Sequence, residues 1–268
     1  MDEDGQKRAL LDDYEITYAP SAYALSTACR RAAGRRGNAA LVVGINAYEK
    51  ERPLVNAVQE AAAIANILNV KPLLDSAATK PVVKTGVKSA AYLHFSCHGS
   101  FNWDAPMDSA LILAHDEPLK LSEIIGELDL RAAQLVTLSA CETGISDVSQ
   151  SPDEYLGLPA GFLQAGAPAI VSSLWSVDDR STALLMERFY RNHLERGLTY
   201  AAALREAQLW LRGATFQELG DYYKTFMRMS AGDAFAAFME LSRHGKPDDC
   251  PYANPFYWAA FTFNGAEE

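Results

Sequence analysis

The chain has 268 residues, of which 49% are apolar and 22% are charged, and its formal net charge is −10. These values are typical of a globular protein and argue against a disordered or fibrous chain. The acidic balance disfavours direct binding of nucleic acid, which usually needs a basic surface. The sequence has no apolar run of about 18 residues, so we expect no membrane span.

Four cysteines occur without a CxxC pair, so neither a zinc ribbon nor a thioredoxin-like motif is expected. A chain of this length does not need disulfides, and its first residues do not resemble a secretory signal peptide. The sequence therefore predicts a cytoplasmic protein with reduced thiols. It has no HExxH motif and no cluster of His and Cys ligands, so we expect neither a metal nor another cofactor.

Hydrophobic patterning predicts alternating strands and helices, of which the first strand and the first helix lie in an N-terminal extension over residues 1–38. The predicted strands are residues 14–18, 39–45, 91–96, 110–114, 134–139, 167–174 and 258–263. The predicted helices are residues 21–33, 55–68, 157–166, 180–196 and 200–211. This alternation predicts a single α/β domain, with its core over residues 39–268 and a mainly parallel central sheet. In such sheets, ligands bind at the carboxyl ends of the strands.

Two predicted strand ends carry reactive side chains. His98 follows the strand at 91–96, and Cys141 follows the strand at 134–139. If these strands are neighbours, the imidazole and the thiol stand side by side at one edge of the sheet. A histidine there can take the proton of the thiol and return it to a leaving amine. Gly99 leaves room for substrate, and its backbone N–H and that of Cys141 form a candidate oxyanion hole.

Each of these residues also has a simpler interpretation. An isolated cysteine is usually packed in a core, and an isolated histidine is more often structural than catalytic. What favours a paired site is that His98 and Cys141 both follow strands and both precede glycine-containing turns. We expect His94 to be a core or supporting histidine, and Cys97 to be a packed thiol.

Several segments of the chain resemble the CHAT domain. They are HFSCHG, LSACETG, GLPAGFLQAGAPAIVSSLWSVDDRSTALLMERFY and NPFYWAAFTFNG. That family belongs to the caspase-like cysteine peptidases, alongside separase, legumain and the metacaspases. The resemblance extends from about Leu10 to Gly265. It implies a caspase-type αβα sandwich and endopeptidase activity through a dyad of Cys141 and His98.

The resemblance also implies a biological setting. Many CHAT proteins carry helical repeats, often TPRs, before this domain. Proteases of the family are linked to bacterial signalling, cell death and antiviral defence, and their substrates include gasdermin-like pore formers. We therefore expect a protein substrate, with a regulatory TPR protein or an RNA-guided effector complex as candidate partners, and no contact with a membrane.

The loop SLWSVDDRS supplies candidates for substrate recognition. The separase branch uses an acidic residue in a comparable loop to receive a basic P1 side chain. By that resemblance, Asp178 or Asp179 lines the S1 pocket and favours Arg or Lys. The alternative is that Asp179 caps the following helix, because Asp is a preferred N-cap residue. Trp175 is a candidate wall of the same pocket, and Asp108 is a candidate contact in the loop after His98.

Two other functions are compatible with the fold class. One is a non-catalytic interaction module in a larger regulatory complex, although intact His98 and Cys141 argue against it. The other is a serine esterase, which the absence of a GxSxG elbow disfavours.

Overall fold

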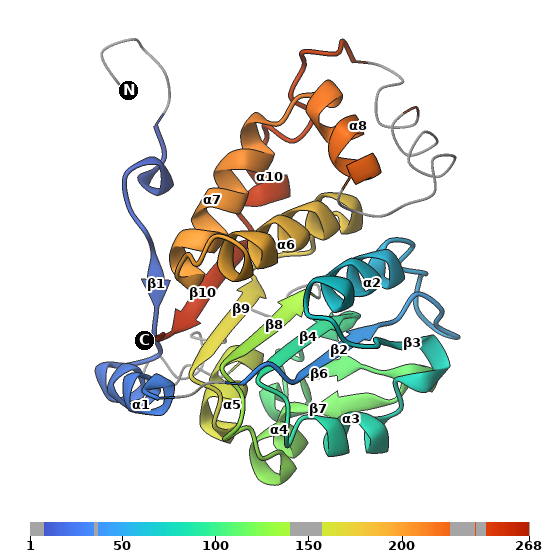
Figure 1. Cartoon of the computed structure of the whole chain (residues 1–268). Coiled ribbons are helices and arrows are strands. Elements are labelled where there is room, and N and C mark those ends of the chain that lie inside the picture. The colour runs from blue at the N-terminus through green and yellow to red at the C-terminus, as the bar shows by residue number, and fades with distance from the viewer. Residues whose placement is uncertain (1–7, 35–36, 140–156, 226–238, 240–244, 268) are drawn as a thin grey trace.

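The computed structural model describes residues 8–34, 37–139, 157–225, 239 and 245–267. Its centre is a seven-stranded sheet in the order β1-β10-β9-β8-β4-β2-β3 (Figure 1). The strands are β1 (Thr17–Tyr18), β2 (Ala40–Gly44), β3 (Leu73–Leu74), β4 (Tyr92–Ser96), β8 (Leu135–Ser139), β9 (Ala169–Ser173) and β10 (Phe261–Gly265). All neighbouring pairs are parallel except β10 and β9. The predicted α/β fold with a mainly parallel sheet is therefore confirmed.

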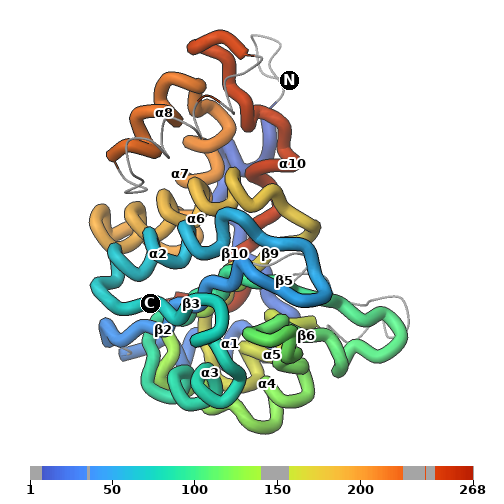
Figure 2. The backbone as a smooth tube through the Cα atoms, turned by 90° about the vertical axis from the view of Figure 1, so that its right-hand side faces the viewer, coloured from blue at the N-terminus to red at the C-terminus, as the bar shows by residue number. Residues whose placement is uncertain are grey.

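Helices cover both faces of this sheet, as Figure 1 and the side view in Figure 2 show. One face carries α2 (Ala57–Ile67), α6 (Asp179–Leu194) and α7 (Tyr200–Gly213). The other carries α1 (Ala22–Ala32), α3 (Lys80–Gly86), α4 (Leu121–Glu127) and α5 (Leu158–Ala165). Two further helices, α8 (Phe216–Thr225) and α10 (Pro255–Trp258), lie beside α7 and α6. Parallel strands need such cover because both of their faces are buried.

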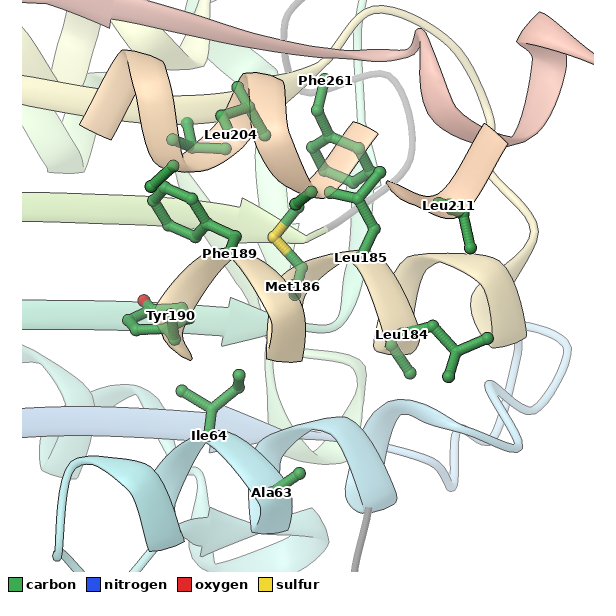
Figure 3. Packing of buried hydrophobic residues seen from close by; sticks show 14 of the residues in the cluster. Ala63, Ile64, Leu184, Leu185, Met186, Phe189, Tyr190, Leu204, Leu211 and Phe261 are labelled. Carbon is green, nitrogen blue, oxygen red and sulfur yellow. The ribbon is translucent and has the colours of Figure 1, made fainter. Parts of the chain in front are cut away.

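The strands of the sheet divide the apolar core into two layers. On β4, the side chains of Leu93 and Phe95 pack in the layer with α3, α4 and α5. The alternate position, Tyr92, packs in the layer with α2, α6 and α7. In this second layer, Phe189 of α6 lies beside Leu204 of α7 (Figure 3). Burial of a side chain of this size is worth about 1.5–3 kcal/mol.

A second, smaller sheet corrects one prediction. Residues 110–114 were expected to extend the central sheet. Instead β6 (Ala110–Ile112) pairs antiparallel with β5 (His98–Ser100) and β7 (Pro118–Lys120). The chain bends at Cys97 and leaves the central sheet before β5 begins. An apolar run of three to five residues carries no information about which sheet it joins, so the sequence pattern did not distinguish the two.

The two ends of the chain also differ from the prediction. The first strand is limited to Thr17–Tyr18, and a 3₁₀ helix at Leu10–Asp12 precedes it. The last strand is Phe261–Gly265 rather than 258–263, because α10 occupies the preceding residues. Asn254 starts that helix, since its Oδ1 accepts a hydrogen bond from the Phe256 N–H at 3.0 Å. None of the helices described has the length and apolar character needed to span a bilayer.

Candidate active site

The strands β4 and β8 are hydrogen-bonded parallel neighbours, as the sequence argument required. Ser96 and Ser139 face each other at their carboxyl ends. His98 follows two residues after Ser96. Cys141 follows two residues after Ser139 in the sequence and lies outside the described residues. Because adjacent strands are about 4.8 Å apart, the two strands end at neighbouring points of the same edge of the sheet.

His98 is a buried side chain, 8% exposed, with three contacts to one loop. Its backbone N–H donates to the Tyr48 hydroxyl at 2.9 Å. Its ring lies against the Tyr48 ring, with 4.6 Å between centroids. Its Nε2 lies 2.8 Å from the backbone carbonyl of Arg52. A carbonyl can only accept a hydrogen bond, so Nε2 carries the proton. In the neutral imidazole, Nδ1 is then the acceptor, as a general base requires.

The loop that makes these contacts, residues 46–56, is called the clamp loop below. Three carboxylates from other elements accept hydrogen bonds from its backbone N–H groups at 2.8–3.2 Å. The donors are Asn46 and Ala47 for Asp75, Glu49 and Lys50 for Asp116, and Asn56 for Asp179. These polar contacts therefore hold the backbone of the loop in place.

Two of these aspartates have left-handed backbones. The φ angle is 45° at Asp75 and 53° at Asp116. Side chains other than glycine rarely adopt this region, and holding one there costs roughly 1 kcal/mol or more. The surrounding structure must offset that cost. Both carboxylates bind backbone N–H groups of the clamp loop. The strained residues are therefore two of those that hold the loop in contact with His98.

A buried polar cluster lies on the face of β4 that packs against α2. Glu60 of α2 is 2% exposed, and its Oε2 accepts a hydrogen bond from Ser96 Oγ at 3.0 Å. Its Oε1 lies 3.0 Å from Nε2 of His94, without the alignment of a hydrogen bond. His94 is fully buried and meets the ring of Tyr190 edge-on. The structure thus places His94 among supporting side chains rather than at the sheet edge.

A small cavity of about 20 Å³ opens between this cluster and the start of α6. Its lining is Leu54, Ala57, Glu60, Ser96, Cys97, Ser139, Val177, Asp179 and Thr182. In this state it has room for about one water molecule. Two of its lining side chains, Glu60 and Asp179, are carboxylates. Ser139 Oγ and Thr182 Oγ1 are buried and make no hydrogen bond with the described residues. The cavity therefore offers polar acceptors in a small space.

The residues predicted to bind substrate lie in different surroundings. Asp179 lines the cavity and is the first residue of α6. Asp178 is the N-cap of α6, because its Oδ1 accepts from the Ser181 N–H at 2.9 Å. The capping function considered for Asp179 therefore belongs to Asp178. Gly99 lies in β5 opposite Leu111.

Two further candidates do not line the cavity within the described part of the chain. Asp108 is half exposed and forms an ion pair with Lys120 at 2.8 Å. It lies beyond the end of β5 that is far from His98, since Ser100 pairs with Ala110. Trp175 donates from its indole N–H to the Phe256 carbonyl at 3.1 Å, so this contact fixes its ring against α10. Cys97, by contrast, is one of the cavity's lining residues; it is fully buried and also packs in the core.

Sequence reasoning missed three contributors to this site: Tyr48, the Arg52 carbonyl and Glu60. A signal for Glu60 was present. It stands on the buried stripe of α2 with Ala57, Ala61 and Ile64, and a carboxylate in such a stripe needs a buried partner. The Arg52 carbonyl had no signal, because a backbone group has no residue type.

Comparison with known proteins identifies the fold family. The family model for the CHAT domain matches residues 1–266. The chain belongs to the CHAT domain family. Tetratricopeptide repeat protein 28 of Homo sapiens is 28% identical over 190 residues, which cover 58% of this chain and 8% of that protein. The Mus musculus protein of the same name is 27% identical over the same length. This CHAT domain therefore spans a small fraction of these relatives.

Solved structures with the same architecture include cysteine proteinases. The Arg-specific cysteine proteinase gingipain R superposes with a TM-score of 0.56 and 12% identity, over 90% of this chain and 51% of that one. A complex of the pro- and mature domains of the Porphyromonas gingivalis enzyme gives a TM-score of 0.51 and 14% identity, over 90% and 52%. At this identity the likeness concerns the fold. The caspase-like architecture expected for the CHAT domain is confirmed.

The buried cluster around Glu60 yields a stability prediction. Glu60→Ala removes the acceptor of Ser96 and the carboxylate beside His94, leaving two buried polar groups without it. We expect a loss of roughly 2–4 kcal/mol in the free energy of unfolding, measured by urea denaturation. Gln59→Ala, on the exposed side of the same helix, is the matched control and should change stability by about 0.5 kcal/mol or less. Equal effects of the two substitutions would contradict the cluster's importance.

Proposed function

We propose that this CHAT domain is a cysteine endopeptidase in which Cys141 is the nucleophile and His98 is the general base. The observation that carries the proposal is the fixed orientation of His98. Its Nε2 is bound to the Arg52 carbonyl, and β4 is the direct neighbour of β8. Nδ1 thus remains available to accept the proton of Cys141, which follows the last residue of β8 by two positions in the sequence.

The chemistry follows from this arrangement. His98 Nδ1 takes the thiol proton, and the thiolate attacks the peptide carbonyl to form a tetrahedral oxyanion. The backbone N–H groups of Gly99 and Cys141 are the proposed donors to that oxyanion. As the C–N bond breaks, the imidazolium returns its proton to the leaving amine. Water then attacks the thioester, with His98 again as base, and releases the acid and the free enzyme.

We further propose a preference for Arg or Lys at P1. The supporting observation is the pair of carboxylates, Asp179 and Glu60, that line the cavity beside Ser139. A cationic side chain entering there would meet opposite charge with little water to screen it. The cavity must widen to admit such a side chain. Of the two aspartates suggested by sequence, Asp179 is the better candidate, because it lines the cavity whereas Asp178 caps the helix.

The biological role is proposed from the family alone. A protein substrate, a TPR-containing regulatory partner and a place in bacterial signalling, cell death or antiviral defence fit a CHAT protease, and the cytoplasm fits its reduced thiols. The name of the human and mouse relatives, Tetratricopeptide repeat protein 28, supports a TPR partner. The second candidate function is a non-catalytic module with the same fold. It predicts no special reactivity at Cys141, so the next experiment separates the two.

Labelling with a peptidyl acyloxymethyl ketone tests the nucleophile. We expect mass spectrometry to map the adduct to Cys141, and Cys141→Ala to abolish labelling with no change in the circular dichroism spectrum. His98→Ala should slow the reaction by roughly 100-fold or more, because the general base is lost.

Cys97→Ala is the matched control, since it replaces another thiol near the same edge, and it should retain most of the reactivity. Equal loss in the two cysteine variants would refute the assignment. So would undiminished labelling of Cys141→Ala.

A positional peptide library tests the S1 proposal. The wild-type protein should prefer Arg or Lys at P1. Asp179→Asn and Glu60→Gln should each weaken cleavage after basic residues more than after neutral ones, because a carboxylate is lost with little change in shape. Asp108→Asn, which removes a carboxylate paired with Lys120 on the surface, is the control. A wild-type profile without preference for basic residues would exclude this pocket assignment.

A further inference from the structure

Tyr48 makes an unusual contact with the short sheet that begins at His98. In this antiparallel pair, His98 stands opposite Ile112. The Tyr48 hydroxyl accepts from the His98 N–H at 2.9 Å and lies 3.5 Å from the Ile112 carbonyl, to which it donates. The phenol therefore bridges a donor and an acceptor that face each other across the two strands.

The hydroxyl can play both parts because it stays protonated. Burial of the ring, reinforced by nearby negative groups, raises the pKa of Tyr48 well above its ordinary value. A neutral phenol donates one hydrogen bond and accepts another. Its ring also lies against the imidazole at 4.6 Å, so a single side chain contacts both the backbone and the ring plane of His98.

We propose that Tyr48 is a positioning residue for His98, which holds the imidazole in the orientation that leaves Nδ1 free to act as the general base. This inference rests on the proposed peptidase function. Tyr48 fixes the backbone and one ring face, while the Arg52 carbonyl fixes Nε2. Both groups belong to the clamp loop, so the loop and the imidazole form one unit. Without the hydroxyl, the His98 N–H and the Ile112 carbonyl lose their shared partner. The first residue of β5, which carries the imidazole, is then held less firmly.

The position of Tyr48 depends in turn on Asp116. This aspartate accepts hydrogen bonds from the N–H groups of Glu49 and Lys50, the two residues that follow Tyr48. The backbone of Asp116 is left-handed where its carboxylate makes these two contacts. Asp116 should therefore influence His98 only through the clamp loop, so its effect should overlap with that of Tyr48, and the two changes together should give less than the sum of their single effects.

The test is the pH dependence of alkylation of Cys141 by iodoacetamide, followed by peptide mass mapping between pH 5 and 9. A thiol paired with a well-placed histidine reacts at lower pH than a free thiol, whose pKa is about 8.5. We expect Tyr48→Phe to slow the reaction about tenfold at neutral pH and to move its midpoint upward by about one pH unit. Tyr14→Phe, a substitution of the same kind at an exposed tyrosine, should match the wild type.

Two further variants make the result decisive. The double variant of Tyr48→Phe with Asp116→Ala should raise the midpoint by less than the sum of the two single shifts. Asp116→Ala keeps the Tyr48 side chain and should itself raise the midpoint, so it carries the test if Tyr48→Phe does not fold. A midpoint that Tyr48→Phe leaves unchanged, while His98→Ala raises it, would overturn the positioning role and leave the peptidase proposal intact. If His98→Ala also leaves the midpoint unchanged, the dyad fails and the positioning role fails with it.

Discussion

Parallel pairing of β4 with β8 is the constraint on which the rest of this structure depends. It sets Ser96 opposite Ser139, so the carboxyl ends of the two strands lie side by side at one edge of the sheet. Burial of both strands between two layers of helices leaves that edge as the place where polar chemistry can meet solvent. The bend at Cys97 then turns His98 into a second sheet, where the clamp loop can reach it.

The site has a cost in stability that the apolar layers must offset. Glu60, His94 and Ser96 occupy buried positions on an element that could otherwise carry apolar side chains. Asp75 and Asp116 hold strained backbones to aim their carboxylates at the clamp loop. Departures of this kind from a fully consistent fold are expected at functional sites. Here they gather around one histidine and one small acidic cavity, which is why we place the function at this edge.

Much of the fold could be predicted from the sequence because the central strands are continuous apolar runs. Residues 39–45, 91–96 and 134–139 have few alternatives to buried parallel strands, and the structure has strands there. The short sheet was assigned wrongly, since the partner of residues 110–112 depends on a bend elsewhere in the chain. The position of His98 after β4 was readable as well. The location of Cys141 beside it stays a prediction, because that residue lies outside the described part of the chain.

The supporting side chains were harder to predict. Tyr48 and Asp116 are far from His98 in sequence, and tertiary contacts alone connect them. The choice between Asp178 and Asp179 turned on one residue of helix register, which sequence patterns rarely fix. Backbone groups such as the Arg52 carbonyl leave no mark in a sequence. The general lesson from this edge of the sheet is that strand ends locate a site, while loops decide which atoms of its side chains are available.

The proposed chemistry depends on the tautomer of His98, which the clamp loop fixes. Its most direct test is a long-range ¹H–¹⁵N NMR spectrum of the protein labelled at histidine, assigned with His98→Ala and recorded where the imidazole is neutral. We expect a proton on Nε2 and an unprotonated Nδ1, because the Arg52 carbonyl can only accept a hydrogen bond. A neutral His98 with its proton on Nδ1 would rule out this role of the clamp loop, since Nδ1 could not then receive the proton of a thiol.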